Sequence, residues 1–436
     1  MNKKQIFPNV SSRAGPPFKL SRYPLVYRSL VGTALGSIGL LAHAQDSDFI
    51  ANSTASLNLR NYYINDNFVG QRATQGKAEE WTQSFIFDAR SGFTQGWIGF
   101  GADVLGLYSQ KLDGGRGTGG TQLLPLHDGG DPADNFGRLG MALKARIAKS
   151  EFKLGEWAPA LPVFGSDDGR SLPQTVRGAQ LQSRDIQNVV ISAGQFRANS
   201  PRDDASMEKM WLNGRPDALS DRFNFLGGQF STVDQRTSVG LWGAQLKDIY
   251  RQQYLHLRHN EQIAGWRLGA NVGLFHGSDD GAAKAGALEN RTWYTQLSLG
   301  QGPNTFLVGV QRVSGESGWM RVNGSSGGEL GNDSFNSSYE NANERSWQIR
   351  HDFDFVAFGL PGLTMMNRYL HGDNIQQAGI IDGKEWGRET ELSYLVQSGP
   401  LASLSVRWRN SSIRRSYGSG SFDENVLVIN YPLQLL

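Results

Sequence analysis

The feature that most constrains the fold is an alternation of apolar and polar side chains that recurs from Ser56 to the last residue. In the segment RLGMALKARIA (138–148), every odd position from 139 to 147 is apolar, whereas Lys144 and Arg146 share the other parity. Successive side chains of a β-strand point to opposite faces, so each such segment predicts a strand with one apolar and one polar face. The chain is therefore predicted to be all-β.

The alternating segments are about 8–11 residues long, which is typical of strands that cross a bilayer around a polar lumen. Connections rich in Gly, Asp and Asn separate them, and Trp81, Trp266 and Trp347 stand near segment ends, where interfacial aromatic girdles form. A soluble β-sandwich or β-helix is the alternative. Many Arg, Lys and Glu on the polar parity and the absence of a solenoid repeat disfavour it. We predict a transmembrane antiparallel β-barrel over residues 45–436.

The N-terminal segment has the pattern of a secretory signal peptide over residues 1–44. Six basic residues precede the short apolar run LVGTALGSIGLL (30–41), and Ala42-His43-Ala44 supplies an A-x-A cleavage site. Without this segment the chain has 37 basic and 41 acidic residues, a net charge of −4. That charge argues against a nucleic-acid-binding surface. Export and a barrel together predict the outer membrane of a Gram-negative bacterium.

Long polar connections interrupt the alternation at six places. In barrels of this class the periplasmic turns are short and the extracellular loops long, so these connections are predicted to be extracellular or folded into the lumen. They are Gln110–Asn135, Pro159–Gln174, Arg197–Arg222, Gly277–Arg291, Ser314–Glu344 and His371–Arg388.

The segment LASLSVRWRN (401–410) predicts a cationic lumen face, because Arg407 and Arg409 lie opposite Val406 and Trp408. The same parity argument places Lys144, Arg146, Arg60 and Arg368 inside. A guanidinium can bind a carboxylate bidentately without holding it tightly in water, so a row of them favours the passage of small carboxylates. The alternative is that these arginines only pair with inward acids such as Glu389 and Glu391 and stiffen the wall.

Motifs that suggest enzymes lack the context that their chemistry needs. The G-x-S-x-G match at 324–328 lies in a polar run without a strand-to-helix turn or a neighbouring His. His256 and His259 lie three positions apart and would point to opposite faces of a strand. We expect no enzyme activity, metal or other cofactor. An outer-membrane barrel hydrolase and a general non-selective pore remain the alternatives.

Segments spread over the mature chain resemble the OprD-type substrate-specific outer-membrane porins of pseudomonads. The segments that carry this resemblance are LRNYY (59–63), WTQSF (81–85), SGFTQGWIGFGADVLG (91–106), QKLDG (110–114), LKARIAKSEFKLGE (143–156), LPQT (172–175), LQS (181–183), KDIYRQQYL (247–255), SWQIRHD (346–352), VQSGPLASLSVRWR (396–409) and NYPLQLL (430–436).

The resemblance implies 18 strands, inward-folded loops, and a monomer or weak homotrimer that admits amino acids or aromatic and cyclic acids passively. A ladder of basic residues would line the path opposite an acidic pocket, for which Asp333 is the candidate. The implied partners are small carboxylate solutes, outer-membrane lipid and lipopolysaccharide, and the barrel-assembly machinery. Relatives often carry Lys where this chain has Ser393 and Arg where it has Val426. The positions that match the basic ladder are Arg407, Arg409, Arg170, Arg60, Lys144, Arg146 and Arg368.

Overall fold

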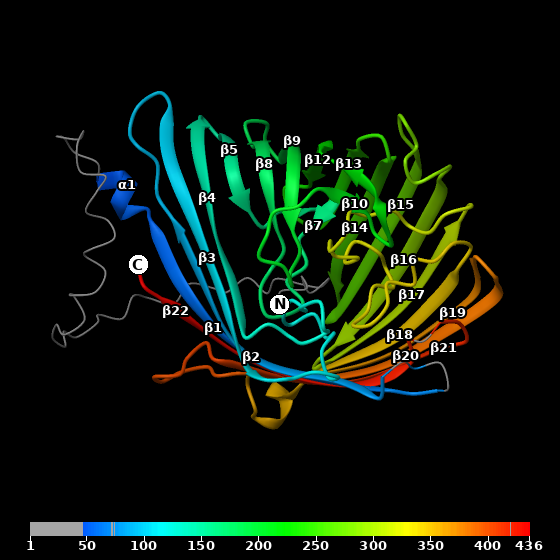
Figure 1. The fold of residues 1–436 in the computed structure, drawn as a ribbon. Helices are drawn as coiled ribbons and strands as arrows, with labels where there is room; N and C mark the ends of the chain where they lie inside the picture. The colour runs from blue at the N-terminus through cyan, green and yellow to red at the C-terminus, as the bar shows by residue number, and fades with distance from the viewer. Residues whose placement is uncertain (1–46, 71–72, 74, 419) are drawn as a thin grey trace.

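The computed structural model describes residues 47–70, 73, 75–418 and 420–436, and its main element is a closed antiparallel β-barrel of 18 strands (Figure 1). Each barrel strand pairs with the next one along the chain, and β22 pairs with β1 to close the ring. Both the all-β prediction and the expected 18 strands are confirmed. The predicted signal peptide, residues 1–44, lies outside the described residues.

All barrel strands are antiparallel to both neighbours, and most are longer than predicted. In chain order they are β1 (Thr54–Phe68), β2 (Lys77–Arg90), β3 (Gly99–Asp113), β4 (Asn135–Ile147), β5 (Ser150–Trp157), β8 (Thr175–Ser183), β9 (Val189–Ser200), β12 (Phe223–Ser231), β13 (Thr237–Leu246), β14 (Tyr250–Ile263), β15 (Trp266–Asp279), β16 (Glu289–Gln301), β17 (Asn304–Ser314), β18 (Arg345–Asp354), β19 (Leu363–Gln377), β20 (Ile380–Leu395), β21 (Ser405–Arg415) and β22 (Phe422–Gln434).

Four short strands and two short helices complete the described elements. They are α1 (Ser47–Ala51), β6 (Ala160–Leu161), β7 (Phe164–Gly165), β10 (Met210–Leu212), β11 (Arg215–Ser220) and the 3-10 helix η1 (Phe355–Phe358). In the part of the chain that the structure describes, no helix has the length and apolar character needed to cross a membrane.

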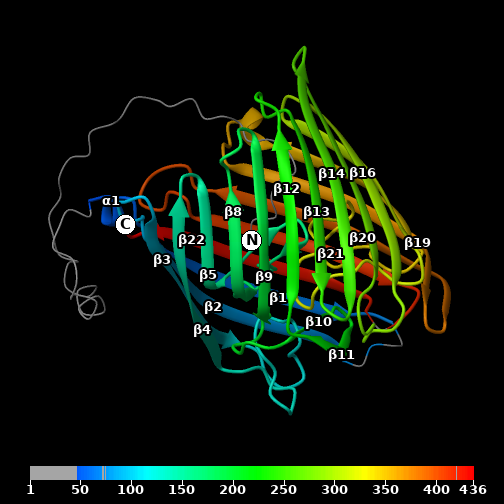
Figure 2. The same cartoon turned by 90° about the horizontal axis from the view of Figure 1, so that it is seen from above.

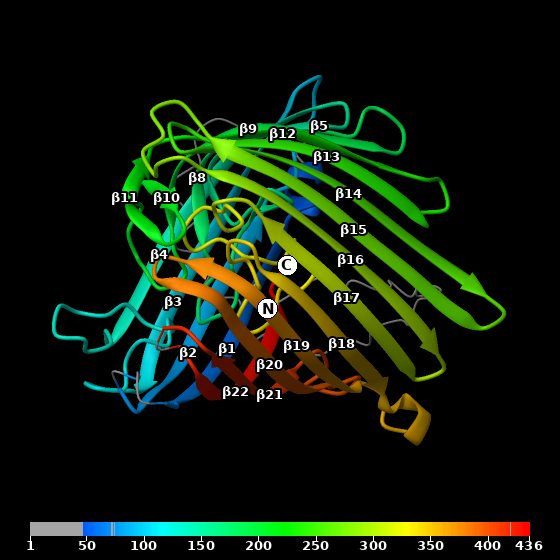
Figure 3. The ribbon, with the colours of Figure 1, turned by 90° about the vertical axis from the view of Figure 1, so that its right-hand side faces the viewer.

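Residues of one parity face outward from the barrel, and residues of the other parity face its lumen. On β4 the residues Leu139, Met141 and Leu143 are 60%, 59% and 66% exposed. Ala142 and Lys144, which have the other parity, are buried. A soluble fold would cover such an apolar row, and a membrane barrel presents it to lipid. Figure 3 shows the oblique course of β13–β19, the tilt that barrel closure requires.

One close approach in the wall requires a glycine. The indole of Trp242 on β13 lies across the neighbouring strand, where a Cβ on Gly227 would come within 2.3 Å of it. Any side chain at position 227 would displace the buried indole. Similar contacts explain part of the high glycine content of this barrel.

The two ends of the barrel differ, as the sequence predicts. At one end of the barrel, short connections join neighbouring strands. This end carries α1 and the C-terminus, which lie side by side in Figures 1 and 2. The opposite end carries the β3–β4 loop (114–134), the β5–β8 loop (158–174), the β9–β12 loop (201–222) and the β17–β18 loop (315–344). By the rule for this barrel class, the second end is extracellular.

Two of the six predicted long connections are wrong or too long. Residues 371–388 are not a loop, because β19 and β20 pair as far as Gln377 with Ile380 around a two-residue turn. Residues 280–288 connect β15 to β16, a shorter segment than predicted. These strands continue past the apolar band into water, where both faces are polar and the hydrophobic period disappears while backbone pairing persists.

Candidate functional site

Inward-folded loops fill the middle of the barrel and are joined to one another (Figure 1). The amide of Ser326 in the β17–β18 loop donates to the Gly165 carbonyl of the β5–β8 loop at 2.8 Å. Asn213 of the β9–β12 loop donates to the Arg321 carbonyl at 2.9 Å. The loops share one apolar core with the wall, to which they contribute Phe164, Met210 and Leu330, among others. They therefore form one constriction of the lumen.

Arg407 and Arg409 face this lumen together from β21, as the alternation predicts. The outward Trp408 between them is exposed, and the two guanidinium-bearing side chains are 15% and 5% exposed. Both approach a single carboxylate, Glu391 on the neighbouring strand β20: Nε of Arg409 lies 2.5 Å from Oε2 and Nε of Arg407 lies 3.9 Å from it. Two cations thus share one acid.

Arg60 faces inward from β1 and holds the β5–β8 loop. Its guanidinium donates to both carboxylate oxygens of Asp168, at 2.6 and 3.1 Å, and to the Arg170 carbonyl at 2.8 Å. Burial alone would raise the pKa of Asp168, but the guanidinium of Arg60 outweighs it and holds that pKa below its usual range. Arg60 is therefore an anchor for the constriction as well as part of its charge.

Arg170 is the inward loop arginine that only the family resemblance indicated. Its Nε donates to the Thr121 carbonyl of the β3–β4 loop at 2.8 Å. Burial lowers the pKa of Arg170, but Tyr62, Glu424 and other neighbouring acids outweigh that effect and raise it. Arg170 therefore remains a cation at the acidic side of the lumen.

Arg368 has the corresponding role for the β17–β18 loop. Its Nε donates to Glu389 on β20 at 2.8 Å, and its NH1 donates to the main-chain carbonyl of Asp333 at 2.9 Å. The ring of Phe335 in the same loop lies under both Arg409 and Arg368, with its centroid 4.2 and 5.5 Å from the two guanidinium carbons. The loop thus contacts two ladder arginines through one aromatic ring.

Asp333, the candidate acid, is half-buried in the loop that Arg368 holds. Its carboxylate accepts a hydrogen bond from the Ser338 hydroxyl at 2.7 Å. The structure therefore brings Asp333 beside the basic residues through its main chain, while its side chain orders the loop.

Lys144 and Arg146 form a second basic group, nearer the short-turn end. Nζ of Lys144 lies 2.7 Å from Asp103 and donates to the Ser91 carbonyl at 2.8 Å. The guanidinium of Arg146 lies 4.3 Å from the centre of the Phe93 ring. These two residues share the inward parity of Arg407, but their partners differ from those of the β21 pair.

The acidic side of the lumen is mostly formed by residues that sequence reasoning missed. Asp66 on β1 lies directly opposite Glu424 on β22, and both are buried. Glu80 on β2 is also buried and accepts a hydrogen bond from Thr121. The alternation in FDENVLVINY (422–431) places Glu424 on the same face as Val426 and Val428, so the parity signal for this acid was present.

The departures from the family pattern also lie in this region. Ser393 pairs directly with Arg407 across β20 and β21, and Val426 pairs with Arg409 across β21 and β22. A Lys at the first position or an Arg at the second would stand beside the β21 pair. Neither residue adds a cation beside the pair, and the next arginine on the same face of β21 is Arg415, whose Nε lies 2.8 Å from Glu385.

The arrangement suits binding and release of an anion more than bond making. Guanidinium groups that share a carboxylate can exchange it for a solute carboxylate with little change in charge. His256 is buried on the inward face and His259 is exposed on the other, as predicted. Among the described residues, no cluster of three or more His, Asp or Glu side chains has the geometry to hold a metal ion.

Comparison with known proteins agrees with the fold. Residues 47–435 match the family model described as outer membrane porin, OprD family. The chain is 56% identical over 408 residues to the porin-like protein GalP of Pseudomonas putida, covering 93% of this chain and 98% of that protein.

Two solved structures of similar proteins contain small ligands. OccK2 (OpdF) of Pseudomonas aeruginosa, in complex with glucuronate, is 57% identical with a TM-score of 0.82, covering 89% of this chain and 100% of that one. OpdK of Pseudomonas aeruginosa with vanillate is 47% identical with a TM-score of 0.85, covering 88% of this chain and 100% of that one.

Proposed function

Because this chain belongs to the OprD family of outer membrane porins, we propose that it admits small carboxylate-bearing solutes passively and selectively. It lies in the outer membrane of a Gram-negative bacterium, and its relatives are channels. The proposal adds the class of solute and assigns the selectivity to inward arginines.

The observation that carries the proposal is the shared acid on the barrel wall. Arg407 and Arg409 both approach Glu391. An incoming carboxylate competes with Glu391 for the two guanidinium groups. The hydrogen bonds that it makes with them replace those that it loses when it leaves water. Because an acid of the wall replaces the solute afterwards, binding stays weak enough for release.

Cyclic and aromatic acids are the favoured solutes over amino acids. Glucuronate and vanillate, found with two similar porins, each carry one carboxylate on a six-membered ring. In this chain Ser393 and Val426 leave the β21 wall without further cations beside Arg407 and Arg409. A ring acid presents only its carboxylate to that pair, whereas an amino acid also carries an ammonium group that two guanidinium groups repel.

Liposome swelling with the purified full-length barrel tests the proposal. We expect faster swelling with vanillate and glucuronate than with vanillyl alcohol and glucose, their uncharged analogues, and slower swelling with arginine than with vanillate. Equal rates for acids and uncharged analogues would indicate a general pore. Conversion of a solute by the purified protein, abolished by one Ser→Ala substitution, would indicate a barrel hydrolase.

A further inference from the structure

A group of cationic and hydrogen-bonding side chains lies on the outer wall of the barrel, away from the lumen. Arg251, His276, Arg291 and Arg312 are all exposed on the outward parity of their strands. They come from β14, β15, β16 and β17, four consecutive strands. All four lie near the ends of these strands that carry the long loops, which is the extracellular end.

The strand register makes these residues neighbours. His276 pairs directly with Arg291, and Trp293, two positions further along β16, pairs with Arg312. Arg312 is thus the diagonal neighbour of Arg291, within reach for long side chains. Arg251 pairs with Ser278, two positions from His276, and its Nε donates to the Ser278 hydroxyl at 3.0 Å. The four side chains form one continuous patch.

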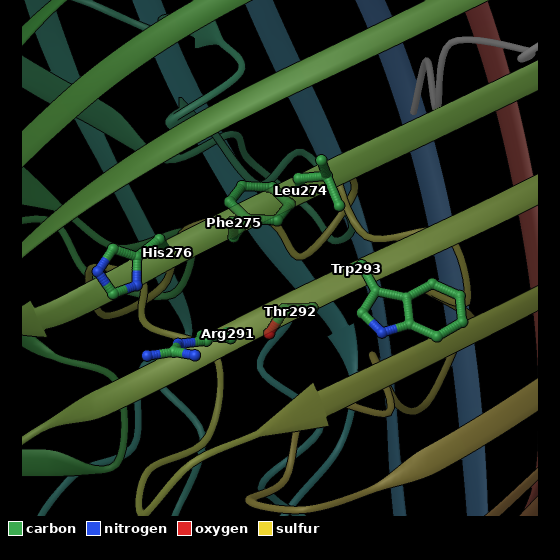
Figure 4. A pocket seen from close by; sticks show the side chains of 6 residues that line it. All are labelled: Leu274, Phe275, His276, Arg291, Thr292 and Trp293. Atoms are coloured by element: carbon green, nitrogen blue, oxygen red, sulfur yellow. The ribbon is translucent and has the colours of Figure 1, made fainter.

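The wall is hollowed below this patch. One hollow has a volume of about 390 Å³. Figure 4 shows His276 and Arg291 at one end of its lining, with Leu274 and Trp293 towards the other end. A second hollow of about 620 Å³ adjoins it, shares His276 and includes Arg251 and the apolar Leu226 in its lining. Polar groups at the extracellular end and apolar surface below match an amphiphile that stands upright in the membrane.

The patch lies just outside the apolar band of the barrel. Along β16 the outward residues after Arg291 are Trp293, Thr295, Leu297 and Leu299, and a girdle Trp marks where the hydrocarbon begins. Along β15 Leu274 precedes His276 in the same way. The polar groups therefore lie at the depth of lipid headgroups, and the first hollow extends from them along Leu274 and Trp293 towards the acyl chains.

The charge of this patch is incompletely balanced by the protein. Arg291 lies 3.5 Å from Glu289, but no carboxylate of a described residue lies within ion-pair distance of Arg251 or Arg312. Other outward cations near the same end each have a carboxylate partner. These ion pairs are Lys77 with Glu79 at 2.6 Å, Arg177 with Glu156 at 3.7 Å, and Arg414 with Asp423 at 2.8 Å. The patch is therefore complementary to an anion supplied from the membrane.

We infer that Arg251, His276, Arg291 and Arg312 form a binding site for a phosphate-bearing lipid of the outer leaflet. Phosphoryl oxygens accept hydrogen bonds from several guanidinium groups at once, and burial of a chain against Leu226, Leu274 and Trp293 adds an apolar contribution. The site is independent of the solute path, because these side chains point away from the lumen.

Binding of purified lipopolysaccharide to the detergent-solubilised full-length barrel, followed by native mass spectrometry, tests this site. We expect the wild type to bind lipopolysaccharide at least about tenfold more tightly than the triple variant Arg251→Gln, Arg291→Gln, Arg312→Gln, the effect of losing a charge-assisted contact. The matched control, Lys77→Gln, Arg177→Gln, Arg414→Gln, removes the same charge from paired sites and should bind as the wild type does.

A second arm needs no variant. Enzymatically dephosphorylated lipopolysaccharide should bind the wild type at least about tenfold more weakly, and inorganic phosphate alone should not compete. Heat-modifiable gel mobility verifies that each variant is folded. Equal binding by the triple variant and the wild type, or equal binding of the two lipids, would overturn the site. If the wild type forms an oligomer without lipid and the triple variant does not, the patch binds a second copy of this chain and the lipid site is overturned.

Discussion

The inward arginines of this barrel differ in what their guanidinium groups already hold. Arg60 and Arg368 each contact both a carboxylate and a loop carbonyl, and so they position the constriction. Arg407 and Arg409 share the carboxylate of Glu391, and the guanidinium of Arg409 also lies over the Phe335 ring of the β17–β18 loop. We propose that solute carboxylates exchange at the β21 pair and that Arg60 and Arg368 position the loops.

Glu391→Gln should increase the preference for carboxylates. The substitution keeps the size of the side chain and removes the negative charge that competes with the solute, so carboxylate binding should tighten by up to about tenfold. Concentration-dependent block of single-channel current by vanillate measures this affinity. Glu289→Gln on the outer wall is the control and should leave it unchanged. Weaker or unchanged block in Glu391→Gln would contradict the competition between wall acid and solute.

Residue-level prediction succeeded where the backbone has a period. Parity placed Arg407 and Arg409 inside and Trp408 outside because a strand fixes the direction of each side chain. Arg170 lies in a loop, where no period exists, and only the family resemblance indicated it. Asp168, the partner of Arg60, was missed for the same reason, since neither alternation nor spacing reports a contact between a loop and a distant strand.

At the scale of elements, one asparagine connects three inward parts of the chain. The side chain of Asn323 in the β17–β18 loop accepts from the Trp211 amide at 3.0 Å and donates to Glu208 at 3.2 Å, both in the β9–β12 loop. Its main-chain carbonyl accepts from Gln174 of the β5–β8 loop at 3.0 Å. The constriction is therefore held as a unit by polar contacts as well as by its apolar core.

Asn323→Ala should loosen the constriction without affecting the wall. It leaves the Trp211 amide and the Glu208 carboxylate without this partner, at a local cost of about 1–3 kcal/mol. We expect more frequent current fluctuations and a larger mean conductance in planar bilayers, with unchanged heat-modifiable mobility. Asn67→Ala, at the exposed end of β1, is the control. Current fluctuations and a mean conductance equal to those of the wild type would show that Asn323 does not hold the loops together.

The loop network should also depend on pH through Glu208. Burial, and then the nearby carboxylate of Asp204, raise the pKa of Glu208 to about 7, against an opposing effect of the Asn323 amide. Because this pKa lies above the unfolded value of about 4.3, the folded loop binds more protons between the two values. The free energy of unfolding of the loop therefore falls as pH rises through this window.

Hydrogen exchange of residues 201–222, corrected for intrinsic rates, measures this dependence. We expect stronger protection at pH 5 than at pH 8 in the wild type, and a much smaller difference in Glu208→Gln, which cannot ionise. The same pH dependence in both proteins would exclude Glu208 as its origin.

Prediction of whole elements depended on hydrophobic alternation, which ends where the strands leave the membrane. Four of the six long connections were located correctly, but residues 371–388 form a continuation of β19 and β20. The end of the hydrophobic alternation marks where a strand leaves the lipid, and the strand itself can continue beyond that point. Where paired strands project into water, both faces are polar and the pattern resembles that of a loop.

At the scale of the whole molecule, closure follows from the pairing of the first and last strands. Arg60 on β1 lies opposite Asn430 on β22, and its Nε donates to the Asn430 amide oxygen at 3.2 Å. Alternation predicted the barrel and its two faces, and the family resemblance supplied the number of strands. The inward folding of the loops depends on contacts between distant segments, which no local pattern encodes.

In the proposed function, a closed barrel narrowed by its own loops selects carboxylates at two arginines on one wall. The reversal potential under a salt gradient in planar bilayers, for Arg407→Ala with Arg409→Ala, tests this most directly. Removal of two lumen cations should shift the potential towards cation selectivity and slow the flux of vanillate in the same preparation. Lys77→Ala with Arg414→Ala, on the outer wall, should change neither. A reversal potential and vanillate flux unchanged from the wild type would contradict the account.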